Sequence, residues 1–104
     1  MKRIINGKRY DTSKATEIAS YSSPHSRRDF HFYAESLYRT PRGNWFLCGE
    51  GGPLSKYSTP AWGGGWTGGE GLTPLTPDEA RAWLERHDFV EELEENFAEQ
   101  IEEA

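Results

Sequence analysis

One cysteine and three histidines are the residues whose chemistry would support nucleophilic catalysis or metal binding. A reactive thiol needs a nearby positive group and access to solvent. The strand pairing expected below separates His31 from Cys48 along the partner strand, so Cys48 is interpreted as a buried, inert thiol. A metal site needs three or four convergent ligands, and His25, His31 and His87 lack the spacing of such a set. The sequence therefore predicts no catalytic residue, no metal, no cofactor and no enzymatic activity.

Glycine and tryptophan are concentrated in residues 49–71, which hold most of the eleven glycines together with Trp62 and Trp66. A phosphate-binding loop is not indicated, because the Gly-Lys-Ser/Thr ending of such loops is missing. Rigid aromatic side chains flanked by glycine are typical of a loop that contacts a partner. The alternative is that both tryptophans fold back onto the sheet, and the sequence leaves the two alternatives open.

The distribution of charge is strongly asymmetric along the chain. Residues 1–77 carry a net charge of +4, whereas residues 78–104 carry −9, which gives −5 for the chain. The segment 88–104 holds acidic residues and no base. As a helix it would be about 25 Å long, with one negative charge per roughly 3 Å, close to the spacing of phosphates along one DNA strand. This pattern leaves two interpretations open: the carboxylates form the solvated face of a docked helix, or they form a surface that occupies a basic, nucleic-acid-binding groove of another protein.

The residues expected to bind that partner are the carboxylates of the segment together with two aromatic contacts. They are Asp88, Glu91, Glu92, Glu94, Glu95, Glu99, Glu102 and Glu103, with Trp62 and Trp66 adding apolar surface.

The acidic segment also carries an apolar stripe, because Leu93, Phe97 and Ile101 recur every four residues. Glutamates four residues apart repel each other and disfavour an isolated helix. The stripe must therefore be buried for the helix to persist, either on the chain's own domain or on a second copy. In the second case these three residues would form the seam of a homodimer.

Length and composition restrict the class of protein. A chain of 104 residues fits one domain, and no apolar run approaches the roughly 18 residues of a membrane span. The lone cysteine excludes a disulfide scaffold, and the first residues lack a signal-peptide pattern. We expect a cytoplasmic protein, in a bacterial host, that does not engage a membrane.

The expected elements alternate between strands and helices. Asn6-Gly7 favours a hairpin turn, and the spacing of Ala15, Ile18 and Ala19 predicts a short helix before residue 22. Strands are predicted at 30–38, 45–48, 55–58 and 72–75. With Thr40 opposite Trp45, one face carries the core side chains Phe30, Phe32, Tyr38, Trp45 and Leu47.

A capping box opens the expected C-terminal helix, because Thr76 and Glu79 can satisfy each other's backbone amides. The apolar pattern restarts near Asp88, which predicts a second helical segment. The domain organisation is accordingly a core at 1–87 and an acidic amphipathic extension at 88–104. The fold class is α+β: a small antiparallel sheet of three to five strands packed with a short N-terminal helix and a longer C-terminal helix.

Several segments resemble a group of small proteins encoded on phages, plasmids and other mobile elements. They are INGKRYDT at 5–12, LYRT at 37–40, GNWFL at 43–47, GEGG at 49–52, and Pro74–Thr76 followed by Glu79-Ala80 and Trp83-Leu84. The resemblance covers roughly residues 2–87, and the acidic segment looks like an addition. The setting of the group is similar to that of anti-CRISPR and other anti-defence genes, and the resemblance carries over no functional residue.

Charge and resemblance together predict a non-enzymatic mobile-element protein that binds and inhibits a host defence complex, such as a CRISPR effector. The expected partner is a host protein or ribonucleoprotein with a basic groove. Direct binding of nucleic acid is not expected, because the chain is acidic as a whole. The alternative is a structural or regulatory module that forms a homodimer through its C-terminal helix.

Overall fold

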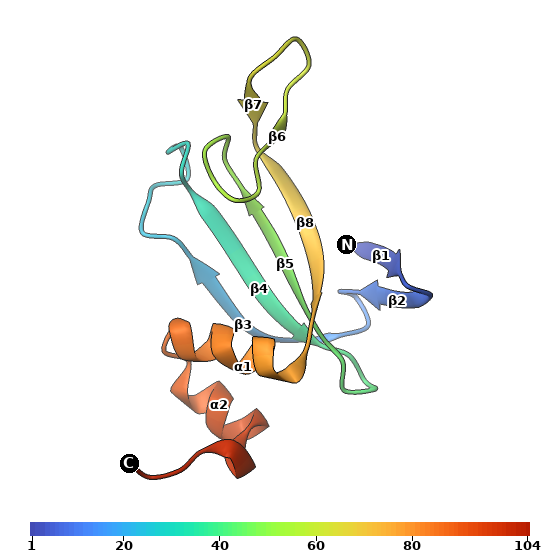
Figure 1. Cartoon of the computed structure of the whole chain (residues 1–104), viewed down its shortest axis with the longest axis vertical. Coiled ribbons are helices and arrows are strands. Elements are labelled where there is room, and N and C mark those ends of the chain that lie inside the picture. Colours follow the sequence, from blue (N-terminus) through green and yellow to red (C-terminus); the bar gives the residue numbers. More distant parts are fainter.

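A four-stranded antiparallel sheet is the centre of the computed structural model, which describes residues 1–104 (Figure 1). Its strand order follows the chain, apart from a small hairpin inserted between the last two strands. This arrangement confirms the α+β class and the antiparallel sheet. The strands are β3 (Thr16–Ser22), β4 (Tyr33–Arg39), β5 (Trp45–Gly51) and β8 (Gly69–Leu75).

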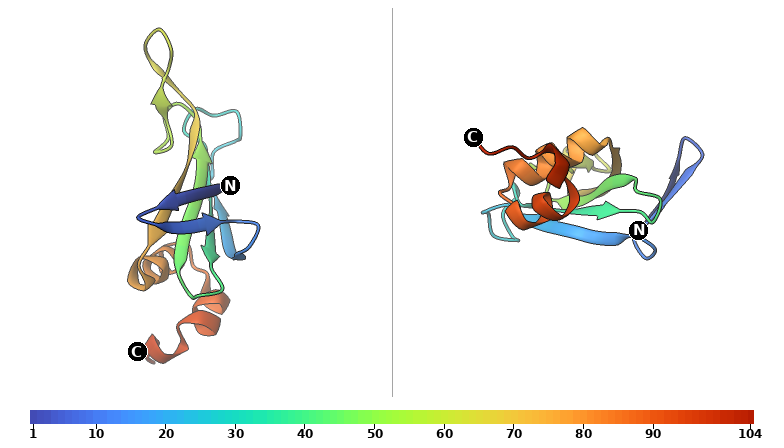
Figure 2. Two further views of the ribbon diagram at one scale, coloured as in Figure 1. Left: turned by 90° about the vertical axis from the view of Figure 1, so that its right-hand side faces the viewer. Right: turned by 90° about the horizontal axis from the view of Figure 1, so that it is seen from below.

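Helices and two small hairpins surround the sheet. The helices lie together on one face of it, and the first hairpin lies away from them (Figure 2). None of the helices has both the length and the apolar character needed to cross a bilayer. The remaining elements are β1 (Lys2–Ile5), β2 (Lys8–Asp11), β6 (Thr59–Pro60), β7 (Trp66–Thr67), α1 (Pro77–Arg86), α2 (Val90–Asn96) and the 3₁₀ turn η1 (Ala98–Gln100).

The sheet buries side chains on both of its faces. On the helix face, the fully buried Leu37 and Leu84 pack with Trp45 and Trp83, which retain 4% and 3% of their exposure. On the opposite face, Tyr10 from the first hairpin packs edge-on against the buried ring of Phe46, with a centroid distance of 5.5 Å. The aromatic core expected from the composition is therefore divided into two clusters.

The predicted N-terminal helix is wrong, because Thr16–Ser22 forms strand β3. Ala19 is buried at 7% exposure on the helix face of the sheet, opposite Leu37 of β4. A bulge between Glu17 and Ala19 shifts the register, which disturbs the simple alternation that marks a strand. Pairing with β4 outweighs a weak helical preference here.

The predicted register of β4 and β5 is wrong by one residue, since Arg39 and not Thr40 lies opposite Trp45. Gly43, with a φ of 86°, closes the turn. A slip of one residue reverses the face of every side chain. Leu37 therefore shares the helix face with Trp45, whereas Tyr38 lies on the other face and stacks on Phe46.

Two other strand predictions need correction. β4 begins at Tyr33, so Phe30 and Phe32 precede it; Phe32 is buried, but Phe30 is 62% exposed and not part of the core. Residues 55–58 form turns, and the short strand β6 follows them. The segment at 72–75 is confirmed as the end of β8.

The turn and cap predictions are confirmed. Asn6 and Gly7 have φ values of 51° and 76°, as the tight turn between β1 and β2 requires. Thr76 accepts a hydrogen bond from the Glu79 amide, and the Glu79 carboxylate accepts one from the Thr76 amide, at the start of α1. The break between the C-terminal helices falls at Asp88, whose φ is 60°.

The acidic segment 88–104 is not one continuous helix. α2 covers only Val90–Asn96, η1 follows, and residues 101–104 have no regular structure. Dense like charge and the absence of a basic residue in its last turn disfavour a longer helix.

Candidate interaction surfaces

The molecule is elongated, with extents of 51 × 35 × 19 Å. The β6–β7 hairpin projects from one end of the sheet, and α2 with the C-terminus lies at the other end (Figure 1). The β1–β2 hairpin lies to the side between them. The first two regions carry the candidate partner-binding residues expected from the sequence.

The acidic end is attached to the fold by apolar side chains. Phe97 is 5% exposed, and its ring stacks on Trp45 with a centroid distance of 5.2 Å. Phe89 stacks on Trp83 at 5.6 Å, and Leu93 packs against the same cluster. These contacts hold α2 against the core even though its intrinsic helical stability is low.

The carboxylates of residues 88–104 have no ion pair within the chain. The four salt bridges of the structure join other residues: Arg27–Glu50, His31–Asp29, Lys56–Glu35 and Arg81–Asp78. In the acidic segment, Glu92 is partly buried and every other acidic residue is exposed. The segment therefore presents a compact, uncompensated negative surface rather than a straight row of charges.

The three residues of the predicted dimer seam do not lie on one free face. Phe97 is buried and Leu93 packs against the chain's own cluster. Ile101, at 47% exposure, is the member that stays open to solvent. The apolar stripe thus serves to dock the segment on its own domain.

The β6–β7 hairpin exposes both of its tryptophans. Trp62 is fully exposed and Trp66 is 60% exposed, so neither folds back onto the sheet. Gly63, Gly64 and Gly65 all have positive φ values at the tip, where a residue with a side chain would be strained. Exposed tryptophans on a projecting hairpin are suited to contact with a partner.

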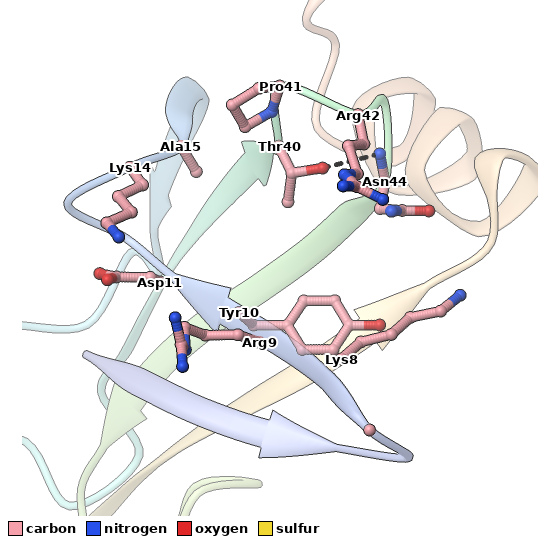
Figure 3. Close-up of a pocket in the computed structure, with 11 residues that line it drawn as sticks. Lys8, Arg9, Tyr10, Asp11, Lys14, Ala15, Thr40, Pro41, Arg42 and Asn44 are labelled. Carbon is pink, nitrogen blue, oxygen red and sulfur yellow. Dashed lines mark hydrogen bonds between the residues drawn. The ribbon is translucent and has the colours of Figure 1, made fainter.

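A hollow of about 620 Å³ lies between the β1–β2 hairpin and the β4–β5 turn (Figure 3). Four bases line it, namely Lys8, Arg9, Lys14 and Arg42, with a single carboxylate, Asp11. The bases were noted in the sequence as a net positive half. Their convergence depends on the turn between β4 and β5, which sequence spacing does not reveal.

A buried carboxylate on β4 is a feature that the sequence reasoning missed. Glu35 is 2% exposed and accepts hydrogen bonds from Trp83 Nε1 at 2.9 Å, from the Tyr57 hydroxyl and from Lys56 Nζ at 2.8 Å. Burial by itself would raise the pKa of Glu35, but the hydrogen bonds from Lys56, Trp83 and Tyr57 lower it. Burial and the bond to Glu35 raise the pKa of Tyr57.

The Glu35 cluster is a cross-link between elements. It joins β4, helix α1 and the turns at 55–58, and the ring of Tyr57 fills the space where a side chain at Gly49 would stand. A signal for it existed in the sequence: Glu35 has the same strand parity as Leu37. A carboxylate on the apolar face of a strand needs donors from elsewhere in the fold.

The candidate chemical residues are dispersed. Cys48 is half-buried rather than fully buried as expected; it lies opposite Ser36 and Leu72, and burial raises the pKa of its thiol. His31 contacts Asp29 and the ring of His25 instead. No three His, Cys, Asp or Glu side chains are placed to hold a metal ion.

His87 makes stability depend on pH. Its ring stacks on Tyr21 at 3.8 Å, its Nε2 is buried without a partner, and burial lowers its pKa. Because the unfolded chain takes up this proton near pH 6.5, stability should fall as pH decreases from about 6.5 toward the lower folded pKa. Urea unfolding measures the free energy of unfolding at neutral and at mildly acidic pH. The decrease between the two pH values should be smaller for His87→Gln than for the exposed control His25→Gln. An unchanged difference in His87→Gln would contradict this assignment.

Comparison of the chain with protein-family models, curated proteins and solved structures finds no match.

Proposed function

We propose that this chain is a non-enzymatic, mobile-element-encoded protein of the host cytoplasm that inhibits a host defence complex by binding its basic groove. The observation that supports it best is the unpaired carboxylate surface of residues 88–104, held on the domain by the buried Phe97. The function rests on charge and shape, and the resemblance to phage and plasmid proteins suggests the class of partner.

Electrostatics explains what the acidic end would do. Exposed carboxylates without ion-pair partners in the chain are not neutralised by its own bases. Their negative potential can therefore steer association with a cationic surface. α2 and η1 gather these charges into a short span, so the surface imitates the charge density of a nucleic acid rather than its regular repeat. A groove that binds phosphates supplies the complementary field.

The Trp62–Trp66 hairpin extends the proposed contact. It lies at the opposite end of a molecule whose longest extent is 51 Å (Figure 1). A partner that engages both ends must therefore present a surface about as long, which exceeds the size of an average small domain. A large ribonucleoprotein effector with a long basic channel meets this requirement.

Charge removal on α2 tests the proposal. In Glu91→Gln/Glu94→Gln/Glu95→Gln, affinity for a purified CRISPR effector ribonucleoprotein should fall about tenfold or more, with a weaker dependence on salt. The matched control is Glu17→Gln/Glu50→Gln/Glu70→Gln, which removes the same charge from exposed positions on the strands of the sheet. Its affinity should stay within about twofold.

Phage plating on a host with an active CRISPR system gives the biological measurement. The intact chain and the control variant should restore plating, and the α2 variant should not. Equal loss in the two variants, or full protection by the α2 variant, would exclude the acidic end as the inhibitory surface.

A further inference from the structure

The basic hollow beside the β1–β2 hairpin has an unbalanced charge. Four bases and one carboxylate line it, and none of the four bases takes part in an ion pair. The Asp11 carboxylate accepts hydrogen bonds from the hydroxyl and the amide of Ser13, which lower its pKa. The carboxylate therefore stays ionised and offsets one of the four positive charges, so the hollow keeps a net positive charge that an anion from outside the chain can balance.

Three separate segments supply the bases. Lys8 and Arg9 come from β2, Lys14 from the turn after it, and Arg42 from the β4–β5 turn (Figure 3). The Thr40 hydroxyl oxygen accepts a hydrogen bond from the Asn44 backbone amide at 3.0 Å, so the hydroxyl proton of Thr40 is free to be donated to a ligand. The bases thus surround an open hollow rather than forming one exposed strip.

The residue types favour phosphate groups. The guanidinium groups of Arg9 and Arg42 can each form paired hydrogen bonds to phosphate oxygens, and the lysines add point charges. Bases spread over about 620 Å³ of open space fit several phosphates in succession better than one enclosed ion. Successive phosphates are the property of a nucleic-acid backbone.

The hollow offers no platform for bases of a nucleic acid. Its single aromatic residue, Tyr10, is 7% exposed and packs on Phe46, so it cannot stack on an unpaired base. Contacts to the backbone position a nucleic acid without reading its sequence. We propose that this hollow binds the phosphate backbone of a nucleic acid without sequence preference.

This proposal is independent of the acidic end and goes beyond the function proposed above. The expectation that the chain avoids nucleic acid came from its net charge of −5. In the fold, no residue of 88–104 lines the hollow, so the net charge of the chain is a poor guide to the local charge of either region. One chain can then contact both the protein and the nucleic acid of a ribonucleoprotein.

Fluorescence anisotropy with a short, labelled, single-stranded oligonucleotide of mixed sequence tests the site at low salt. Affinity for the oligonucleotide should fall about tenfold or more from the intact chain to Arg9→Gln/Arg42→Gln. The magnitude of the slope of log affinity against log salt concentration should decrease by about one to two. The control Arg28→Gln/Arg86→Gln removes two exposed, unpaired bases elsewhere and should change affinity less than about twofold. All four positions are exposed, and thermal unfolding checks that each variant is folded.

Three results would overturn the proposal. The first is that the intact chain does not bind the oligonucleotide, and the second is that Arg9→Gln/Arg42→Gln and the control variant lose affinity equally. The third is that the intact chain binds an acidic polyglutamate peptide more tightly than the oligonucleotide, and that Arg9→Gln/Arg42→Gln abolishes the binding of the peptide. The α2 variant Glu91→Gln/Glu94→Gln/Glu95→Gln separates this site from the proposed function. It should bind the oligonucleotide as well as the intact chain or better, because it repels phosphates less.

Discussion

Replacing Glu35 with alanine should destabilise the protein by about 3–5 kcal/mol, because truncation leaves two donors in the interior without an acceptor, each at a cost of about 1–3 kcal/mol. The indole N–H of Trp83 and the hydroxyl of Tyr57 would lose their acceptor inside the core. Lys56 would lose it as well, although its side chain is half-exposed and can turn to water. A loss of this size is a large part of the total stability of a small domain.

Urea unfolding followed by tryptophan fluorescence measures this effect. Glu35→Gln, which keeps the shape and one acceptor, should cost less, about 2 kcal/mol. The control is Glu50→Ala, whose ion pair with Arg27 joins side chains that are 57% and 74% exposed; it should change stability by less than about 1 kcal/mol. A similar, small loss for Glu35 and Glu50 would mean that the buried carboxylate is not a structural cross-link.

Replacing Phe97 with alanine should cost about 3–5 kcal/mol, the range found for buried aromatic side chains. The variant removes the ring that stacks on Trp45 and leaves a gap beneath α2. Because intrinsic helix stability is low in this acidic segment, α2 should detach while the sheet stays folded. Hydrogen exchange should then show loss of protection confined to residues 88–101.

Two further variants complete the Phe97 experiment. Phe97→Leu should recover part of the lost free energy of unfolding, since it refills most of the gap. Ile101→Ala, at an exposed site, should change the free energy of unfolding by less than about 0.5 kcal/mol. The Phe97→Ala chain keeps every carboxylate, so weaker binding of the effector by this variant would show that their placement on the domain matters. A loss below about 1 kcal/mol would show that Phe97 does not anchor the segment.

Local signals in the sequence were sufficient for the turns and caps. Asn6-Gly7 and the Thr76/Glu79 pair act through backbone geometry and near neighbours, and both adopt the expected conformation. The α+β class followed from the alternation of patterns. The long-range pairing did not follow, because a bulge in β3 and a turn shifted by one residue at Gly43 depend on contacts between strands.

The candidate surfaces were predictable to different degrees. The exposure of Trp62 and Trp66 was one of two alternatives that the sequence left open. The length of α2 was overestimated, because an apolar stripe does not reveal where repulsion between like charges ends a helix. The convergence of Arg9 and Arg42 and the donors around Glu35 needed the folded topology. Such sites combine residues far apart in the chain, whose approach no periodicity encodes.

The order of the strands has a consequence for synthesis on the ribosome. β3, β4 and β5 are consecutive in the chain and pair with one another in that order, so this meander can form early through local contacts. The helices that cover Leu37 and Trp45 are made last. The apolar face of the nascent sheet therefore stays exposed until the final quarter of the polypeptide emerges from the ribosome. A chaperone would be needed most during this interval.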